Sequence, residues 1–403
     1  MNRNRVNKKR MGGARVLSRA AAGMLAAALC FQPMTALAGP AGDTSLTTSS
    51  SNAGPGGGSG SSNSGSTGSF GGSTSVSNGS VSAVTSGLGV YRVTENEGIG
   101  AIARGVDVSY WQQNVNWSQV ASDNVQFAML ATRFRGNVDP FFAMNAANAS
   151  QAGLRLGAYI YSYATSVEMA QQEADFVLDL IKDYPISFPV VFDAEDANTL
   201  GTLTPSQVSD VINAFCKRIQ DAGYYPMVYA NEYWIANKID MSKISYDMWV
   251  AKYQQKYTYS KTSMWQASNT GSVKGVNGNV DIDYLYKDYT QIIPGNTWRT
   301  IAGNRYYYQN HVMQKLAWIN DGQNWYYMNA SGNPSTGWLE LSGKKYYLEA
   351  DGHMITGWKT LDGGWRYFDA SGEQATGWRA VDGSRYFMAD KGLMQTGWLQ
   401  TGG

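Results

Sequence analysis

Apolar and polar residues between about 103 and 290 follow the pattern of alternating strands and helices. Short apolar runs typical of strands occur at 127–131, 156–163, 188–193, 226–230 and 248–251. The clearest helix between them begins at a capping box, Thr204 to Gln207, with Pro205 at its first helical position, and ends at Gly223. Strands separated by helices indicate a parallel sheet, and this many strands indicate a barrel. Because the segment is short for eight full units, we expect an incomplete (β/α) TIM-like barrel of the α/β class over residues 92–290.

A different pattern fills residues 295–403, where tryptophan recurs every 20 residues. The six positions are Trp298, Trp318, Trp338, Trp358, Trp378 and Trp398. Each unit also carries a second aromatic cluster and glycines at turn positions, which predicts a β-hairpin. Since a single hairpin cannot bury its own aromatic face, the units are expected to stack into an all-β hairpin-repeat solenoid.

The N-terminal 91 residues show neither pattern. Residues 1–38 hold seven basic residues and no acid, then a short apolar stretch, then the small-x-small signal Ala36-Leu37-Ala38. This predicts a secretory signal peptide and therefore a secreted, extracellular protein. Residues 39–91 are dominated by serine and glycine and are predicted to be a flexible linker.

Charge and composition exclude several function classes. Lys and Arg number 32 against 31 for Asp and Glu, and removal of the signal peptide would leave a mildly acidic chain without a basic patch for nucleic acid. No further apolar run is long enough for a membrane span after signal cleavage. With only two histidines, a His-based zinc site or a Ser-His-Asp triad is not expected, and Cys216 has the helical spacing of a core thiol. Catalysis is expected to use carboxylates, with no metal and no cofactor.

The candidate chemistry lies at strand ends. A buried-strand run ends in Asp193-Ala194-Glu195, and acids also end two other probable strands, at Asp107 and Asp281. Residues two apart on a strand point to one face, so Asp193 and Glu195 are predicted to lie together. Two close carboxylates raise each other's proton affinity, which keeps one of them protonated as a general acid.

These acidic stretches resemble glycoside hydrolase family 25, the lysozymes that cleave peptidoglycan. The resemblance covers essentially all of 104–288 and rests on segments 105–111, 139–140, 157–159, 189–196, 215–219, 222–224, 229–231, 264–266 and 278–283. It implies that Glu195 protonates the glycosidic oxygen and that Asp193 stabilises charge on the 2-acetamido group of the substrate. It also implies that Asp107 and Asp281 complete an acidic floor.

Further site residues follow from the same resemblance. The candidate substrate-binding residues are Tyr110, Tyr161, Tyr229, Trp249, Trp265 and Asp283. Asp283 stands where the family usually has asparagine, which leaves open whether Asp281 or Asp283 is the fourth acid. Ala194 stands where the family often has an aromatic residue, and by strand alternation it is expected to point away from the cleft.

The 20-residue units resemble the choline-binding and related cell-wall-binding repeats of Gram-positive surface proteins. In that family, aromatic side chains of adjacent repeats form a cage for a quaternary ammonium. The candidate ligand-binding residues here are Trp318, Trp325, Tyr327, Trp338, Tyr347, Trp358, Trp365, Tyr367 and Trp378. The sequence departs from the family at Arg305, Lys345 and Arg385, which replace a cage tryptophan, so a glycan is as good a candidate ligand as teichoic acid choline.

Together these features predict a secreted, cell-wall-associated muramidase. Its substrate would be bacterial peptidoglycan, cut between N-acetylmuramic acid and N-acetylglucosamine, and the repeats would hold it on a wall polymer. Two alternatives remain at this point. One is a non-catalytic wall adhesin with a degenerate barrel, and the other is an enzyme acting on a different β-linked glycan.

Overall fold

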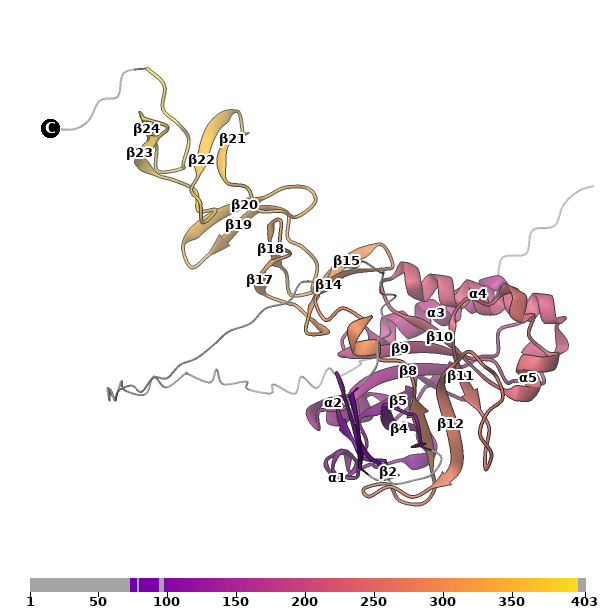
Figure 1. Cartoon of the computed structure of the whole chain (residues 1–403). Coiled ribbons are helices and arrows are strands. Elements are labelled where there is room, and N and C mark those ends of the chain that lie inside the picture. The colour runs from indigo at the N-terminus through magenta and orange to yellow at the C-terminus, as the bar shows by residue number, and fades with distance from the viewer. Residues whose placement is uncertain (1–72, 78–79, 94–97, 398–403) are drawn as a thin grey trace, which may run out of the picture. The chain divides into compact units, whose positions relative to one another are not determined.

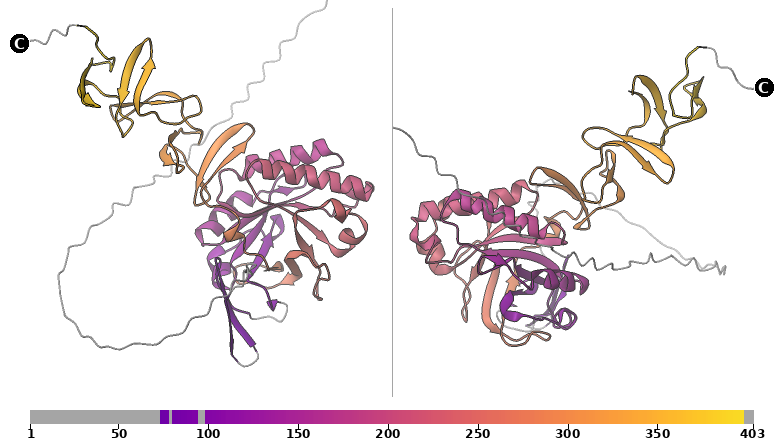
Figure 2. Two further views of the ribbon diagram at one scale, coloured as in Figure 1. Left: turned by 45° about the horizontal axis from the view of Figure 1, so that its top comes forward. Right: turned by 180° about the vertical axis from the view of Figure 1, so that it is seen from behind.

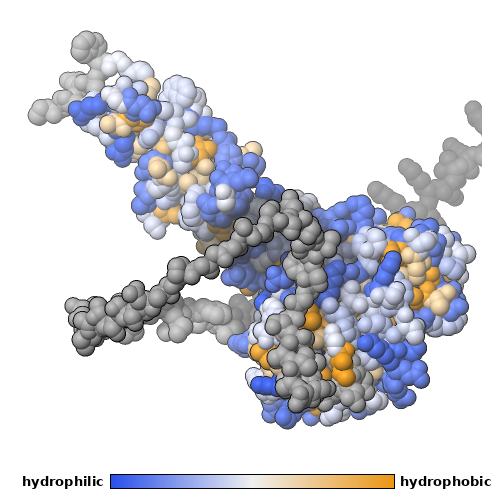
Figure 3. Space-filling model, viewed as in Figure 1, coloured by the Kyte–Doolittle hydropathy of each residue, from blue (hydrophilic) through white to orange (hydrophobic). Residues whose placement is uncertain are grey.

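The computed structural model describes residues 73–77, 80–93 and 98–397 (Figure 1). The predicted signal peptide, most of the predicted linker and Trp398 lie outside these ranges. Within them, no helix has the length and apolar character needed to cross a membrane. On the face that Figure 3 shows, hydrophobic residues form separate patches among hydrophilic ones.

Eight strands close into a barrel, in the order β10-β11-β12-β13-β4-β5-β8-β9. They are β4 (Ala103–Val108), β5 (Phe127–Ala131), β8 (Arg155–Tyr161), β9 (Ile186–Asp193), β10 (Pro226–Asn231), β11 (Asp247–Ala251), β12 (Thr262–Gly271) and β13 (Val280–Leu285). All neighbouring pairs are parallel except those of β13, which is antiparallel to both β12 and β4. The predicted barrel is confirmed, with its last strand reversed.

The barrel is incomplete in its helices, as expected from its length. Five α-helices lie along the segment: α1 (Trp117–Ser122), α2 (Phe142–Gln151), α3 (Val167–Ile181), α4 (Pro205–Asp221) and α5 (Glu232–Asn237). No α-helix occurs between β11 and β13, all of whose residues are described. The views of Figures 1 and 2 show α3 and α4 side by side outside the ring of strands.

Two apolar layers hold this architecture together. Alternate strand residues fill the barrel interior, including Phe127, Phe188 and Met227, all almost completely buried. The intervening residues pack outward against the helices, as strand alternation requires. Helix α4 begins at the predicted capping box, with Thr204 accepting a hydrogen bond from the Gln207 amide. Cys216 on α4 is fully buried, and burial raises the pKa of its thiol, so the core-thiol prediction is confirmed.

The last part of the predicted linker is ordered into strands, which corrects its C-terminal boundary. Strands β1 (Ser73–Ser77), β2 (Ser80–Ser86) and β3 (Gly89–Tyr91) form an antiparallel sheet. Val84 and Tyr91 are buried in the same apolar layer as the outer barrel residues. These few apolar side chains are buried against the barrel. The serine-rich sequence around them gives no local signal of this contact.

The repeats form the predicted hairpins. They are β14 (Thr297–Ile301) with β15 (Asn304–Gln309) and β16 (Val312–Met313), β17 (Ala317–Asn320) with β18 (Trp325–Met328), β19 (Gly337–Leu341) with β20 (Lys344–Leu348), β21 (Gly357–Leu361) with β22 (Gly364–Phe368), and β23 (Gly377–Val381) with β24 (Ser384–Met388). Successive units stack through their aromatic rings, as when Trp298 packs on Tyr326 at a centroid distance of 4.9 Å. A smaller hairpin, β6 (Arg133–Phe134) with β7 (Asn137–Val138), projects from the barrel.

The first repeat hairpin packs against the outside of the barrel. The guanidinium of Arg299, only 1% exposed, lies between the rings of Tyr224 and Tyr308, at 3.9 and 4.3 Å from their centroids. The Tyr308 hydroxyl donates to the Lys182 carbonyl at 2.8 Å, just after α3. This hairpin therefore shares its core with the barrel, in addition to starting the repeat array.

Candidate active site

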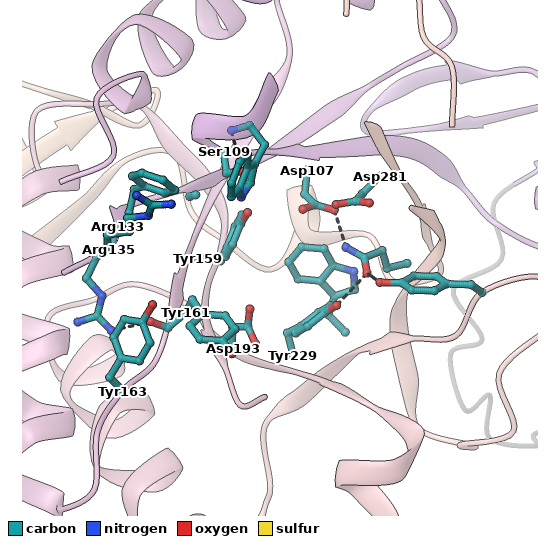
Figure 4. Close-up of a pocket in the computed structure, with 16 residues that line it drawn as sticks. Asp107, Ser109, Arg133, Arg135, Tyr159, Tyr161, Tyr163, Asp193, Tyr229 and Asp281 are labelled. Carbon is teal, nitrogen blue, oxygen red and sulfur yellow. Dashed lines mark hydrogen bonds between the residues drawn. The ribbon is translucent and has the colours of Figure 1, made fainter. Parts of the chain in front are cut away.

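Three strands bring acids to one end of the barrel. Asp107 lies near the end of β4, Asp193 is the last residue of β9, and Asp281 lies at the start of β13 (Figure 4). Because β13 is antiparallel, its beginning meets the carboxyl ends of the parallel strands, where barrel active sites lie. The three side chains line a cavity of about 400 Å³.

The cavity walls are strongly aromatic. Its aromatic lining residues are Trp111, Phe134, Tyr159, Tyr161, Tyr163, Tyr229, Trp249 and Tyr253. Aromatic faces next to carboxylates are suited to a neutral, polyhydroxylated ring with an apolar face, because the rings supply contact area and the acids accept hydrogen bonds.

Asp107 and Asp281 form a tightly coupled pair. They are direct cross-strand neighbours on β4 and β13, so their side chains lie on the same face of the sheet. Burial raises the pKa of Asp281 to about 6. The pKa of Asp107 is raised well above its usual value, first by burial and then by the charges of Asp281 and Asp283. Both carboxyl groups therefore hold a proton more tightly than an exposed aspartate does.

Gln266 on β12 fixes the orientation of Asp107. Its amide nitrogen donates to Asp107 Oδ2 at 2.7 Å, and its amide oxygen accepts from the hydroxyls of Tyr229 and Tyr253, both at 2.8 Å. All three contacts agree on which end of the amide is which, so the side chain has one favourable orientation. Gln266 was not among the predicted residues, although a polar residue inside an apolar strand run is a signal that could have found it.

Asp193 and Glu195 lie at the end of β9 but line adjoining hollows. Asp193 is 7% exposed, and its Oδ1 accepts no hydrogen bond from any described residue. Its pKa is raised well above the usual value by burial and then by the charge of Glu195. Between them, Ala194 is buried in the outer apolar layer, so the prediction that it points away from the cleft is confirmed.

Glu195 occupies a second hollow of about 370 Å³ that shares the Tyr253 side chain with the main cavity. The backbone amide of Asn231 donates to Glu195 Oε1 at 2.6 Å. Burial raises the pKa of Glu195, and the hydrogen bond from Asn231 partly opposes this. Strand alternation predicted that Asp193 and Glu195 share one cavity, but β9 ends at Asp193, so alternation does not extend to Glu195.

The two acids of β13 have different surroundings. Asp281 lines the cavity, whereas Asp283 is fully buried beneath it and accepts a hydrogen bond from the Trp249 indole at 2.9 Å. Burial followed by the charge of Asp281 raises the pKa of Asp283 well above its usual value. The carboxyl that faces the cavity is therefore Asp281, and Asp283 supports the tryptophan that forms part of its wall.

Three of the predicted aromatic residues, Tyr161, Tyr229 and Trp249, do line the cavity. Trp265 does not, and its prediction as a substrate-binding residue is wrong. It is 1% exposed, points outward from β12, and donates its indole N–H to the Lys252 carbonyl at 2.9 Å. Tyr110 is also absent from the lining and instead stacks on the lining residue Phe134 at 4.1 Å.

Much of the aromatic rim lies outside the set of predicted residues. Trp111, 68% exposed, follows the Asp107 strand directly and was visible in the same sequence segment. Phe134 lies on the β6–β7 hairpin, whose strands are too short to give a pattern. Arg133 also lines the cavity and is held by a salt bridge to Glu173 at 2.7 Å.

Metal-ligand geometry is not evident in the described part of the chain. Within residues 73–77, 80–93 and 98–397, no group of three or more His, Cys, Asp or Glu side chains is placed to hold a metal ion.

The predicted aromatic residues of the repeats lie on one face of their hairpins, each tryptophan against a cross-strand tyrosine. The ring centroids of Trp318–Tyr327, Trp338–Tyr347 and Trp358–Tyr367 are separated by 5.4, 5.3 and 5.1 Å. The remaining predicted residues, Trp325, Trp365 and Trp378, are 47%, 50% and 47% exposed. All nine side chains are therefore positioned on or beside an accessible aromatic surface.

Comparisons with known families and proteins agree with this division of the chain. A family model described as glycosyl hydrolases family 25 matches residues 106–276. A choline-binding repeat model matches residues 335–376, and a putative cell wall binding repeat model matches residues 317–333.

Two of the curated relatives illustrate the similarity. The uncharacterized protein YegX of Escherichia coli (strain K12) is 31% identical over 189 residues, which cover 44% of this chain and 68% of that protein. Lysozyme M1 of Streptomyces globisporus is 29% identical over 195 residues, covering 44% and 66%. Among solved structures, the CTP1L endolysin aligns over 47% of this chain and 69% of that chain, with 25% identity and a TM-score of 0.42.

Proposed function

Because the chain belongs to glycosyl hydrolase family 25 and carries choline-binding-type repeats, we propose that it is a secreted, cell-wall-associated muramidase. Its substrate would be peptidoglycan, and the scissile bond the β-1,4 linkage between N-acetylmuramic acid and N-acetylglucosamine. The observation that carries the proposal is the cavity at the carboxyl end of the barrel. There, acids from three strands face aromatic walls, and a further acid lies in the adjoining hollow.

Glu195 is proposed as the general acid and base. Its burial raises its pKa, which favours the protonated form needed to donate to the glycosidic oxygen as the bond to the sugar C1 breaks. The leaving sugar would then lie on the side of the hollow that contains Glu195. In the second half of the reaction, the Glu195 carboxylate would take a proton from the water that attacks C1.

Asp193 is proposed to stabilise the intermediate state. The carbonyl oxygen of the substrate's own 2-acetamido group would attack C1, and positive charge would develop on the acetamido nitrogen. The Asp193 Oδ1 that lacks a described partner is free to accept the N–H of that group. Since the substrate supplies the nucleophile, configuration is retained without a covalent bond to a carboxylate, unlike the usual retaining scheme.

Asp107 and Asp281 are proposed to complete the floor of the site. Their cross-strand pairing and the contact of Asp107 with Gln266 keep the two carboxyl groups side by side. Such a pair can accept hydrogen bonds from sugar hydroxyls without placing two full negative charges in one buried place.

The repeats are proposed to hold the enzyme on a wall polymer, either the choline of teichoic acid or a glycan. Attachment raises the local concentration of the substrate at the barrel without any new contact at the catalytic site.

The decisive experiment compares Glu195→Gln with wild type on purified cell walls. We expect the variant to lose at least ~100-fold in rate, because glutamine cannot supply the proton. Glu168→Gln, which removes an exposed acid on α3, is the matched control and should clear walls like wild type. A Glu195→Gln protein that clears walls at the wild-type rate would contradict the assignment of the acid, and an inactive wild type would favour the non-catalytic adhesin.

Mass spectrometry of the released muropeptides tests the bond. Products with muramic acid at the reducing end are expected. Any other reducing end would show that the enzyme cuts a different β-linked glycan or a different bond of the same polymer.

A further inference from the structure

In each described repeat the tryptophan lies beside side chains of its own unit or of the next one, and for Trp298, Trp318, Trp338 and Trp358 a ring of the next hairpin takes part. We call this arrangement an aromatic corner and name each by its tryptophan. The described residues contain five such tryptophans: Trp298, Trp318, Trp338, Trp358 and Trp378. The side chains that complete the corners differ in an alternating way, and this alternation carries the inference.

Two corners are entirely aromatic. In the Trp358 corner, Trp365 lies at a centroid distance of 6.3 Å and an interplanar angle of 87°, and Tyr386 of the next unit at 4.8 Å and 73°. In the Trp318 corner, Tyr346 of the next unit lies at 5.0 Å and 63°. Trp325 completes the Trp318 corner, because the strand pairing puts it on the same face as Trp318.

The other three corners contain an arginine over the indole. The guanidinium carbons of Arg305, Arg366 and Arg385 lie 4.2, 4.9 and 5.0 Å from the ring centroids of Trp298, Trp338 and Trp378. These distances are within the range of a cation–π contact.

Two of these arginines are fixed by further contacts. Arg366 is 7% exposed, donates to the Lys391 carbonyl, and forms a salt bridge with Asp362 at 3.2 Å. Arg305 donates to the Asp351 carbonyl at 3.3 Å. They are therefore held in their corners by groups outside the rings, and an external ligand would have to displace them.

The arginines reach equivalent places from different positions in the repeat. Arg305 and Arg385 come seven residues after the tryptophan of their own unit, whereas Arg366 belongs to the following unit, eight residues after Trp358. What the three filled corners share is a cation over the indole and not a conserved sequence position. The three arginines therefore indicate that an aromatic corner favours a cation.

We propose that Arg305, Arg366 and Arg385 act as built-in ligands that close three corners, and that the array binds two external organic cations, one each at the Trp318 and Trp358 corners. The open corners present ring faces from several directions, which suits a quaternary ammonium because such a cation has no N–H groups that need acceptors. Trp325 and Trp365 are about half exposed, so a ligand can reach both corners.

The Trp338 corner provides a contrast that supports the division. It opens on a hollow of about 390 Å³ whose charged lining residues are Lys345, Arg366 and Lys391 together with Glu340 and Asp362. Both acids are already paired, Asp362 with Arg366 at 3.2 Å and Glu340 with Lys345 at 4.0 Å. The arginine that already lies over the ring therefore disfavours an external cation there. This inference rests on the proposed wall-polymer binding by the repeats and does not depend on the proposed hydrolysis.

Calorimetric titration of the intact chain with choline chloride tests the stoichiometry. We expect two sites for wild type and one for Trp365→Ala. Arg305→Trp should raise the number to three, because it gives the Trp298 corner the same composition as the two open corners. Wild type that binds no choline, or more than two equivalents, would overturn the proposal.

A matched pair of variants separates the role of the arginine from that of the missing tryptophan. Lys345→Trp alone should leave two sites, because Arg366 still covers Trp338. The double variant Lys345→Trp with Arg366→Tyr should have three. Three sites with the single variant would refute the idea that the arginines close the corners. Two sites with both the double variant and a folded Arg305→Trp protein would also refute it. Wall hydrolysis by the same preparations is a separate readout, so failure of this proposal is distinguishable from failure of the proposed activity.

Discussion

Replacing Asp281 with asparagine removes one carboxyl of the coupled pair at the catalytic end of the barrel. The pKa of Asp281 is about 6 in the folded protein against an ordinary value of 3.8. Since the folded state then binds a proton more tightly than the unfolded state, the free energy of unfolding falls as pH rises between these two values. At about 1.4 kcal/mol per pH unit, the loss amounts to about 3 kcal/mol above pH 6.

Asparagine stays neutral at every pH, so Asp281→Asn should be more stable than wild type at pH 7 by up to about 3 kcal/mol. The charge of Asp281 also raises the pKa of Asp107. Its removal should therefore lower the pKa of Asp107, which further increases the stability of the variant at pH 7. We expect the variant to lose most of its hydrolytic activity, because it lacks an acid of the site. It should gain stability, because the repulsion between the buried acids is removed.

Urea denaturation followed by tryptophan fluorescence at pH 4 to 8 measures this effect. The expected result is a wild-type midpoint that falls across this range and an Asp281→Asn midpoint that falls less. Asp390→Asn, at an exposed position in the last hairpin unit, controls for removal of a negative charge. A variant less stable than wild type at pH 7, or with the same pH dependence, would refute the reasoning.

Three further predictions follow from single contacts. Gln266→Leu should lower kcat at least ~10-fold with a smaller change in KM, because Asp107 loses the donor that orients it. Steady-state hydrolysis of labelled walls measures both parameters, and an unchanged kcat would contradict the role of Gln266 in orienting Asp107. Tyr308→Phe should cost about 1 kcal/mol in urea denaturation, since its hydroxyl donates to a carbonyl after α3; no loss would show that this contact between hairpin and barrel is unimportant. Gly105→Ala should destabilise the barrel by at least ~2 kcal/mol, because a methyl group at Gly105 would meet the Phe127 ring at 2.2 Å; a wild-type melting temperature would contradict the tight packing.

The barrel and the acids were predictable because each leaves a local signal. Apolar runs marked the strands, and an acid at the end of such a run marked Asp107 and Asp193. The facing direction of a strand was harder to predict, as the two tryptophans of β11 and β12 show. Trp249 points inward and Trp265 outward, and both stand in similar apolar surroundings in the sequence. Only Gln266, a polar residue on the inward face, distinguishes the two directions.

Features that depend on distant contacts were not predictable. Tyr91 is buried by the barrel, so a Ser/Gly-rich segment gave no sign of its strands. Glu195 follows the end of β9, where strand alternation no longer applies. In the repeats, Arg305 and Arg385 were visible as departures from a family pattern. Arg366 was not, because it acts on the tryptophan of the preceding unit.

The closing strand β13 also determines the order in which the fold can form. Strand β4 pairs with β13 on one side, so the first barrel strand waits for the last one before the ring can close. Pairing between segments so far apart in the chain is slow to form. Asp107 and Asp281 therefore meet only after nearly the whole domain has been synthesised. A chain that ends before β13 therefore lacks both the closed ring and the paired acids of the site.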